Sequence, residues 1–257
     1  MTTSPCDLRG LSVLVTRPAH QADALCEAIE AAHGRPVCFP AMEILGPEEP
    51  AAVRAQLAGA ARADLLIFVS ANAVEHAFPL LPETLPGDLR IAAVGRATAR
   101  RLAEVGLEPD LLPARPDSEG LLALPELTRV AGRRVIIVRG DGGRALLGDT
   151  LRARGAEVHH VTAYRRRRPR RDPANLIAGW SRLVDVAVAT SNEILDNLMA
   201  LLGPEGSSRL CRTDLLVVSE RMAEHARNRG CRRVHRAASA SDADLLAALC
   251  RLAADTA

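Results

Sequence analysis

Short runs of apolar, mostly β-branched residues recur along the chain, each followed by a glycine-rich or polar turn and a segment with helical spacing. Residues 133–164 show this pattern most fully. Val135–Val138 is typical of a buried strand, a turn with three glycines covers 139–143, and leucines at 146, 147 and 151 have helical spacing. A second apolar run covers residues 156–161. This order of strand, turn, helix and strand predicts half of a parallel α/β domain.

The same order appears near the N-terminus, which indicates an internal duplication. Residues 11–44 repeat the strand, turn, helix and strand of residues 134–166. Three further segments match in the same order: 64–78 with 185–199, 90–106 with 214–230, and 117–127 with 241–252. Duplication on this scale predicts two similar α/β domains, each built on a parallel sheet.

The order of the repeated segments favours a discontinuous division into domains. Each first segment ends in an extended run that can leave its own sheet and cross to the other domain. We predict one domain from residues 1–36 plus 168–257, a second from 43–157, and interdomain connectors at 37–42 and 158–167. A contiguous division near residue 130 is the simpler alternative.

The composition excludes several classes of function. At 257 residues and 48% hydrophobic content the chain can bury a large core, and 2% aromatic content makes that core aliphatic. A formal net charge of +2 gives no field that would attract nucleic acid or an anionic membrane. The sequence contains no lysine, which excludes a lysine Schiff base and the usual pyridoxal-phosphate mechanism. The arginine run at 165–171 has no interleaved aromatic residues, and we interpret it as a solvated loop or hinge.

The cysteines and histidines form no metal-ligand cluster in the sequence. Six cysteines, at positions 6, 26, 38, 211, 231 and 250, make no C-x-x-C pair, and we predict buried free thiols in a reducing compartment. His159 and His160 are adjacent, so in a strand they point to opposite faces. No apolar run approaches the roughly 20 residues of a membrane span. We therefore expect a cytoplasmic protein without a metal or a membrane partner.

Candidate ligand-binding residues stand at the carboxyl ends of the predicted strands, where parallel α/β sheets bind their ligands. They are small, hydroxylated or arginine residues near helix N-termini: Arg17, Ser70, Asn72, Arg96, Thr98, Arg139, Gly140, Gly143, Arg144, Ser191, Asn192, Ser219 and Arg221. Each Ser, Thr or Asn also suits a helix N-cap, and the glycine turn equally suits close packing of helix on sheet. Together the set suits a polycarboxylate or polyphosphate. Neither the dinucleotide fingerprint nor the phosphate-loop motif is present.

Tyr164 is the chain's only tyrosine and lies on the second predicted connector. One interpretation is a packed aromatic residue with its hydroxyl at the surface. The other is a phenol donor at the site, because an ordinary phenol stays protonated near neutral pH.

Several segments, taken in order, resemble the uroporphyrinogen-III synthase family over nearly the full length. They are VLVTRPAHQADAL, IFVSANAV, AAVGRATARRL, VRGDGGRALLGDTLRARGA, VTAYRR and VVSERMAEHA. The resemblance implies two flavodoxin-like α/β domains joined by a two-stranded β-ladder hinge. The chain departs from the family at Met222, because some relatives have a glycine and threonines in this loop and a methionine cannot donate a hydrogen bond.

The resemblance also implies an activity. The family's enzymes are cofactor-free lyases of tetrapyrrole biosynthesis (heme, siroheme and cobalamin). They close hydroxymethylbilane to uroporphyrinogen III, with loss of water and inversion of ring D through a spiro intermediate, and Tyr164 stands at the position the family uses for catalysis. We expect a monomer that acts on this small-molecule polycarboxylate, without nucleic acid. The alternatives are a non-catalytic regulatory module of the same fold that binds an anion or tetrapyrrole, and a solute-binding protein of periplasmic type.

Overall fold

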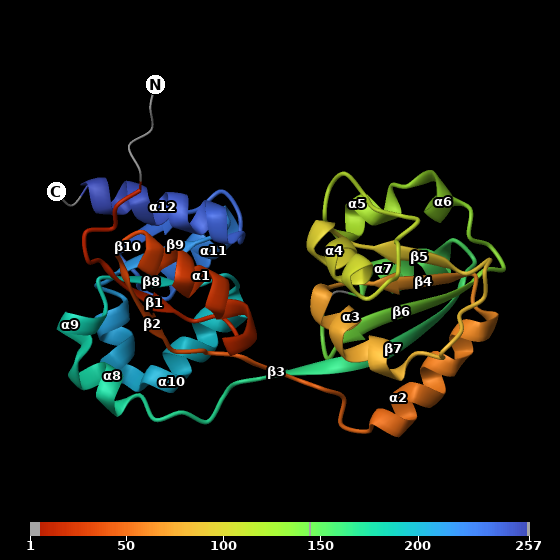
Figure 1. Ribbon diagram of the computed structural model, residues 1–257, viewed down its shortest axis with the longest axis horizontal. Coiled ribbons are helices and arrows are strands. Elements are labelled where there is room, and N and C mark those ends of the chain that lie inside the picture. The colour runs from red at the N-terminus through yellow and green to blue at the C-terminus, as the bar shows by residue number, and fades with distance from the viewer. Residues whose placement is uncertain (1–5, 144, 256–257) are drawn as a thin grey trace. The chain divides into compact units, whose positions relative to one another are not determined.

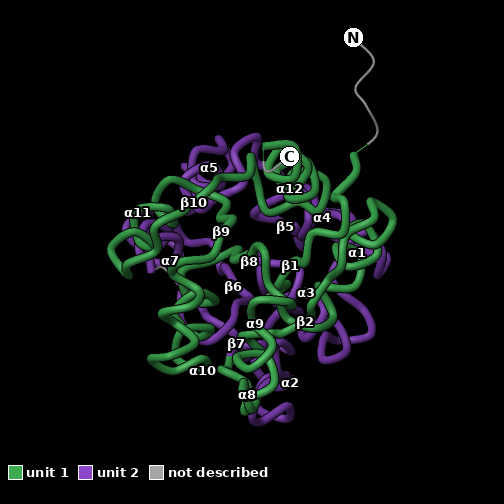
Figure 2. Tube along the Cα trace, turned by 90° about the vertical axis from the view of Figure 1, so that its left-hand side faces the viewer, with its two compact units in different colours: residues 1–43, 167–257 green, residues 44–166 purple. Residues whose placement is uncertain are grey.

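The structure, a computed structural model, describes residues 6–143 and 145–255. The chain divides into two compact units, which Figure 2 colours separately. Unit 1 comprises residues 1–43 and 167–257, and unit 2 comprises residues 44–166. The chain therefore passes between the units twice.

Unit 1 is a parallel sheet in the order β10-β9-β8-β1-β2 with helices packed against it (Figure 1). Its strands are β1 (Ser12–Val15), β2 (Arg35–Cys38), β8 (Val186–Val188), β9 (Asp214–Val217) and β10 (Arg233–Arg236). Its helices are α1 (Ala19–Ala31), α8 (Ala174–Ala178), α9 (Trp180–Leu183), α10 (Asn192–Leu210), α11 (Glu220–Asn228) and α12 (Asp242–Asp255). Helix α10 is kinked at Gly203, which has a positive φ and is followed by Pro204. Leucine and isoleucine side chains of α1 and α12 pack against β1 and β8 in the core.

Unit 2 contains a second sheet, in the order β3-β7-β6-β4-β5. Its strands are β3 (Glu43–Leu45), β4 (Leu65–Phe68), β5 (Arg90–Ala93), β6 (Arg134–Gly140) and β7 (Glu157–Arg167). Its α-helices are α2 (Pro50–Leu57), α3 (Ala71–Ala77), α4 (Arg96–Glu104), α5 (Ser118–Leu122), α6 (Pro125–Thr128) and α7 (Leu146–Ala153), with 3-10 turns η1 (Ala58–Arg62) and η2 (Phe78–Leu80).

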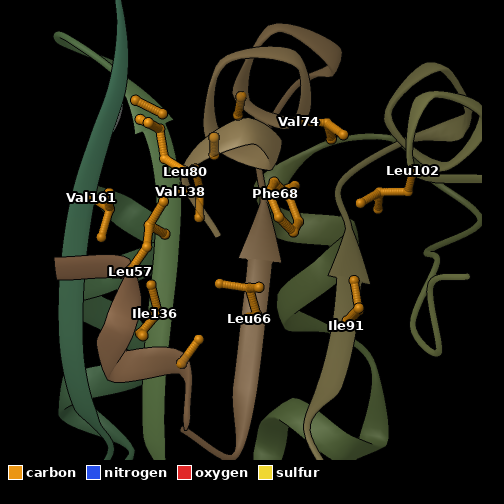
Figure 3. Close-up of a cluster of buried hydrophobic side chains, with 14 of the residues drawn as sticks. Leu57, Leu66, Phe68, Val74, Leu80, Ile91, Leu102, Ile136, Val138 and Val161 are labelled. Atoms are coloured by element: carbon orange, nitrogen blue, oxygen red, sulfur yellow. The ribbon is translucent and has the colours of Figure 1, made fainter. Parts of the chain in front are cut away.

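Both faces of the second sheet are buried at β4 and β6, which explains why these two strands contain continuous apolar runs. Leu66 and Phe68 of β4 pack with Ile136 and Val138 of β6 under α2, α3 and α4 (Figure 3). The alternate residues of the same strands pack on the opposite face under α5, α6 and α7. Successive side chains of a strand point to opposite faces, so each strand supplies both layers.

Matched hydrogen bonds in the two units confirm that the domains are similar. In unit 2, Asp64 Oδ2 accepts a hydrogen bond from the backbone N–H of Arg134 at 2.8 Å. In unit 1, Asp185 Oδ2 accepts one from the backbone N–H of Ser12, also at 2.8 Å. Both pairs join the start of one strand to its neighbour and occupy equivalent positions of the sequence repeat.

Strand β7 differs from the connector that the sequence predicts. Residues Glu157–Tyr164 pair in parallel with β6, so they do not leave their own sheet. Val161 and Ala163 lie in the core of unit 2. Burial of these apolar side chains keeps the strand in the sheet, and the part of the predicted connector up to Arg166 belongs to unit 2.

The cysteines correct a second prediction, because Cys6 and Cys250 form a disulfide with their Cα atoms 5.6 Å apart. Among the other described cysteines, Cys231 is buried, whereas Cys38 is exposed. Cys26 Sγ lies 2.7 Å from Cys38 Sγ, and Cys211 Sγ lies 3.5 Å from Cys231 Sγ. Burial raises the pKa of the Cys26 and Cys231 thiols to about 12. Cys6 and Cys250 are 244 residues apart in sequence, so cysteine spacing could not reveal their pairing.

Within the described part of the chain, every helix is too short or too polar to cross a membrane.

Candidate active site

A pocket of about 210 Å³ lies at the carboxyl edge of the second sheet, entirely within unit 2. Strands β4, β6 and β7 are parallel, so their carboxyl ends meet at one edge. Ser70 follows β4, Arg139 and Gly140 end β6, and Tyr164 lies near the end of β7. Each of these residues lines the pocket, which the rule for parallel α/β sheets anticipates.

Tyr164 is held in the pocket by contacts at both its ring and its hydroxyl. It is 6% exposed, and its hydroxyl oxygen lies 3.1 Å from Ser70 Oγ. Its ring stacks on His76, with the centroids 6.0 Å apart and the planes at 26°. The pairing of β6 with β7 shifts register after Arg139, so Gly140 stands opposite Tyr164. The phenol therefore has a fixed position in the pocket.

The glycine turn after β6 adopts a conformation that other residues resist. Gly142 and Gly143 have φ angles of 86° and 98°, in the left-handed region. The Arg139 guanidinium donates hydrogen bonds to the carbonyl oxygens of Gly140 and Gly142. Asp141 joins the turn to β7, because its N–H donates to the Tyr164 carbonyl at 3.0 Å. Arg139 thus braces the turn, and Arg144 lies outside the described residues.

His160 lines the same pocket and was missed by the sequence analysis. Its ring lies over Gly148, where a β-carbon would stand 2.6 Å from Nε2. Its Nδ1 is buried and has no hydrogen-bond partner among the described residues. Burial lowers the pKa of His160, and the charges of Arg139 and Arg152 lower it further. The sequence feature that could have indicated His160 is a polar residue in a predicted strand that leads to Tyr164.

The other predicted residues of unit 2 lie apart from this pocket. Among the described residues that line it, Asn72, Arg96 and Thr98 are absent. Arg96 is the exposed first residue of α4, whereas the Thr98 side chain is buried and 4% exposed. Asn72 is in the first turn of α3 and is half-buried.

In unit 1 the predicted residues stand at the equivalent edge of the first sheet. Ser191 caps α10 by accepting from Ile194 N at 3.1 Å, and Ser219 caps α11 by accepting from Met222 N at 3.3 Å. Asn192 and Arg221 follow these caps, Asn192 half-buried and Arg221 exposed.

Arg17 and Met222 are both buried at this edge of unit 1. Arg17 is 8% exposed and donates hydrogen bonds to Asp242 and to the Ala240 carbonyl. It braces unit 1, and its predicted contact with substrate is not favoured by this geometry. Met222 is 3% exposed, so it belongs to the core of unit 1.

The fold and the pocket together define a duplicated α/β protein whose candidate site presents a phenol, a serine hydroxyl, a histidine and an arginine-braced glycine turn. The family model described as "Uroporphyrinogen-III synthase HemD" matches residues 23–247. The chain belongs to the uroporphyrinogen-III synthase family.

Two relatives and one solved structure illustrate the similarity. The chain is 38% identical to the uroporphyrinogen-III synthase of Salmonella typhimurium and 37% identical to that of Escherichia coli. Both matches cover 93% of this chain and 100% of the relative. A crystal structure of a mutant Thermus thermophilus uroporphyrinogen III synthase has a TM-score of 0.63 at 19% identity, covering 96% of this chain and 100% of that chain. This likeness shows that the fold is shared.

Proposed function

We propose that the chain closes hydroxymethylbilane to uroporphyrinogen III, with loss of water and inversion of ring D through a spiro intermediate. Family membership makes the chain an enzyme of tetrapyrrole synthesis. The observation that carries the detailed proposal is Tyr164, a buried phenol that lines a pocket at the ligand-binding edge of a parallel sheet.

Tyr164 is proposed to supply the proton that the reaction needs. The carbon–oxygen bond of the hydroxymethyl group breaks, and its oxygen leaves as water after taking the phenol proton. The cation that remains forms a carbon–carbon bond with the ring D α-carbon that already carries the bridge to ring C, which gives the spiro intermediate. The bond between that ring D carbon and the bridging carbon then breaks, which leaves a second cation on ring C, and the free α-carbon of ring D bonds to it. This free α-carbon finally loses its proton, which restores the phenol. Substrate therefore yields product and water with no change of oxidation state.

The rest of the site needs to bind the carboxylates of the substrate and to fit its shape, and no nucleophilic attack by the protein is required. The substrate is a polycarboxylate, and arginine side chains and backbone N–H groups of a glycine turn suit carboxylates. Without an enzyme the linear substrate closes to the I isomer. The site must then favour the transition state that leads to the III isomer, which requires differential binding of that state.

We expect a monomer that acts without nucleic acid, in the cytoplasm. The balanced formal charge of +2 supports the absence of a nucleic-acid partner. Analytical ultracentrifugation and cell fractionation test these expectations directly.

The decisive experiment is a product-isomer assay. Freshly prepared hydroxymethylbilane is supplied, the products are oxidised to porphyrins, and the I and III isomers are separated by chromatography. A dominant III isomer is expected. Formation of the I isomer alone, at the spontaneous rate and with well-folded protein, would overturn the proposal and leave a non-catalytic binding module.

A further inference from the structure

We propose that Ser70 is a positioning residue: its hydroxyl donates to the Tyr164 oxygen and so leaves the phenol hydrogen directed at the substrate. This inference rests on the proposed function, since it specifies how Tyr164 is prepared for proton donation. It differs from the prediction that Ser70 itself binds substrate.

The groups around Ser70 leave its hydroxyl hydrogen available for this bond. Its Oγ accepts a hydrogen bond from Ala73 N at 3.1 Å as the N-cap of α3. A serine hydroxyl has one hydrogen and two lone pairs. With one lone pair occupied by Ala73, the hydroxyl keeps its hydrogen to donate, and the Tyr164 oxygen lies 3.1 Å away. If Tyr164 donated to Ser70 instead, its hydrogen would not be available to the leaving oxygen of the substrate.

This chain of hydrogen bonds also favours the transition state. As the phenol gives up its proton, negative charge develops on the Tyr164 oxygen. A hydrogen bond to a charged oxygen is stronger than one to a neutral oxygen. The bond from Ala73 N polarises the Ser70 hydroxyl and strengthens its donation. The Ser70 contribution is therefore larger in the transition state than in the ground state.

The sequence repeat shows that the helix cap does not depend on the tyrosine contact. Ser191, the equivalent residue of unit 1, caps α10 through Ile194 N at the same distance of 3.1 Å. Ser70 and Ser191 have similar extended backbones, with φ angles of −162° and −153°. In the described part of the chain, only the unit 2 serine also contacts a tyrosine hydroxyl. The capping role is thus common to both units, whereas the tyrosine contact is specific to the pocket.

Substitutions at position 70 can separate the two roles. Ser70→Gly removes the hydroxyl but keeps most of the capping preference, because glycine is weaker than serine at an N-cap by only a few tenths of a kcal/mol. Ser70→Thr keeps both. Ser241→Gly is the matched control, since Ser241 Oγ accepts from Asp244 N at 3.2 Å at the start of α12 in unit 1. We expect kcat of Ser70→Gly to fall about 10- to 100-fold with KM nearly unchanged, and Ser70→Thr and Ser241→Gly to keep most of their activity.

A double-mutant cycle tests whether Ser70 acts through Tyr164. In a Tyr164→Phe background, Ser70→Gly is expected to cause no further loss of kcat. An equal loss in both backgrounds, or a change confined to KM, would overturn the inference and return Ser70 to direct substrate binding. An unaffected kcat in Ser70→Gly would also overturn it. Failure of the wild-type protein to form the III isomer would instead overturn the proposed function.

Discussion

The α-carbon of Gly140 lies against the phenol ring of Tyr164. A β-carbon at position 140 would stand 2.6 Å from Cζ, 2.7 Å from Cε2 and 3.0 Å from the hydroxyl oxygen of that tyrosine. The first two distances are shorter than real β-carbon contacts, so glycine is required here for space. The end of β6 thus serves as the surface on which the phenol rests.

Gly140→Ala is therefore expected to displace Tyr164 and to lower kcat at least about 10-fold, because misplacement of a catalytic group by about 1 Å is costly. The overpacked side chain should also cost about 1–3 kcal/mol of stability. Gly59→Ala is the control, since its added β-carbon would stand 3.7 Å from Ile136 Cδ1, an ordinary contact. The isomer assay and urea denaturation measure both effects. Wild-type kcat in Gly140→Ala would contradict the packing argument.

Tyr164→Phe tests the phenol without changing the packing. The ring remains, and the loss of the Ser70 contact should lower the free energy of unfolding by about 1 kcal/mol. Turnover should fall by roughly 10²-fold or more, which is the usual contribution of a general acid. The products should shift towards the I isomer as the spontaneous reaction takes over. A large drop in melting temperature would instead support the packed-aromatic interpretation.

Features encoded locally could be predicted from the sequence. The apolar runs of β4 and β6 follow from burial on both faces, and the left-handed turn follows from Gly142 and Gly143. Ser70 and Ser191 cap their helices as residue type and spacing indicate. The caps and the turn have physical causes that act within a few residues, and the apolar runs are visible in the sequence although distant helices bury them.

Features that depend on distant contacts could not be predicted. Arg17 is predicted from the sequence to bind substrate, and the fold brings Asp242 to its guanidinium across 225 residues of sequence. Cys6 meets Cys250 for the same reason. The pocket position of His160 requires β7 to stay paired with β6, which the extended pattern of the strand leaves open.

His160 should make the folded protein sensitive to mild acid. Burial, together with Arg139 and Arg152, lowers its pKa below the usual 6.5, although Asp149 acts weakly in the opposite direction. As the pH falls through about 6.5, His160 takes up a proton in the unfolded chain, whereas in the folded protein it stays neutral until a lower pH. The resulting loss of stability is absent above about pH 6.5 and grows as the pH falls towards the lower folded pKa.

His160→Gln should reduce this loss, so the free energy of unfolding of the variant should fall less steeply than that of the wild type between about pH 7 and 5. His159→Gln is the matched control, because His159 is exposed and its Nε2 lies 2.8 Å from Glu157 Oε1. Urea denaturation at several pH values measures both slopes. Equal slopes for His160→Gln and wild type would contradict the assigned environment of His160.

The disulfide between Cys6 and Cys250 should stabilise unit 1, because it ties the segment before β1 to α12 across 244 residues of sequence. A long closed loop restricts the unfolded chain, and such disulfides typically contribute about 2–5 kcal/mol. Reduction is therefore expected to lower the free energy of unfolding by that amount. The Cys6→Ser/Cys250→Ser variant should start at the lower value and respond little to reductant, and mass spectrometry after alkylation counts the free thiols. An equal response to reductant in variant and wild type would contradict this prediction. It would indicate that the remaining cysteines, whose Sγ atoms also lie in close pairs, cause the response.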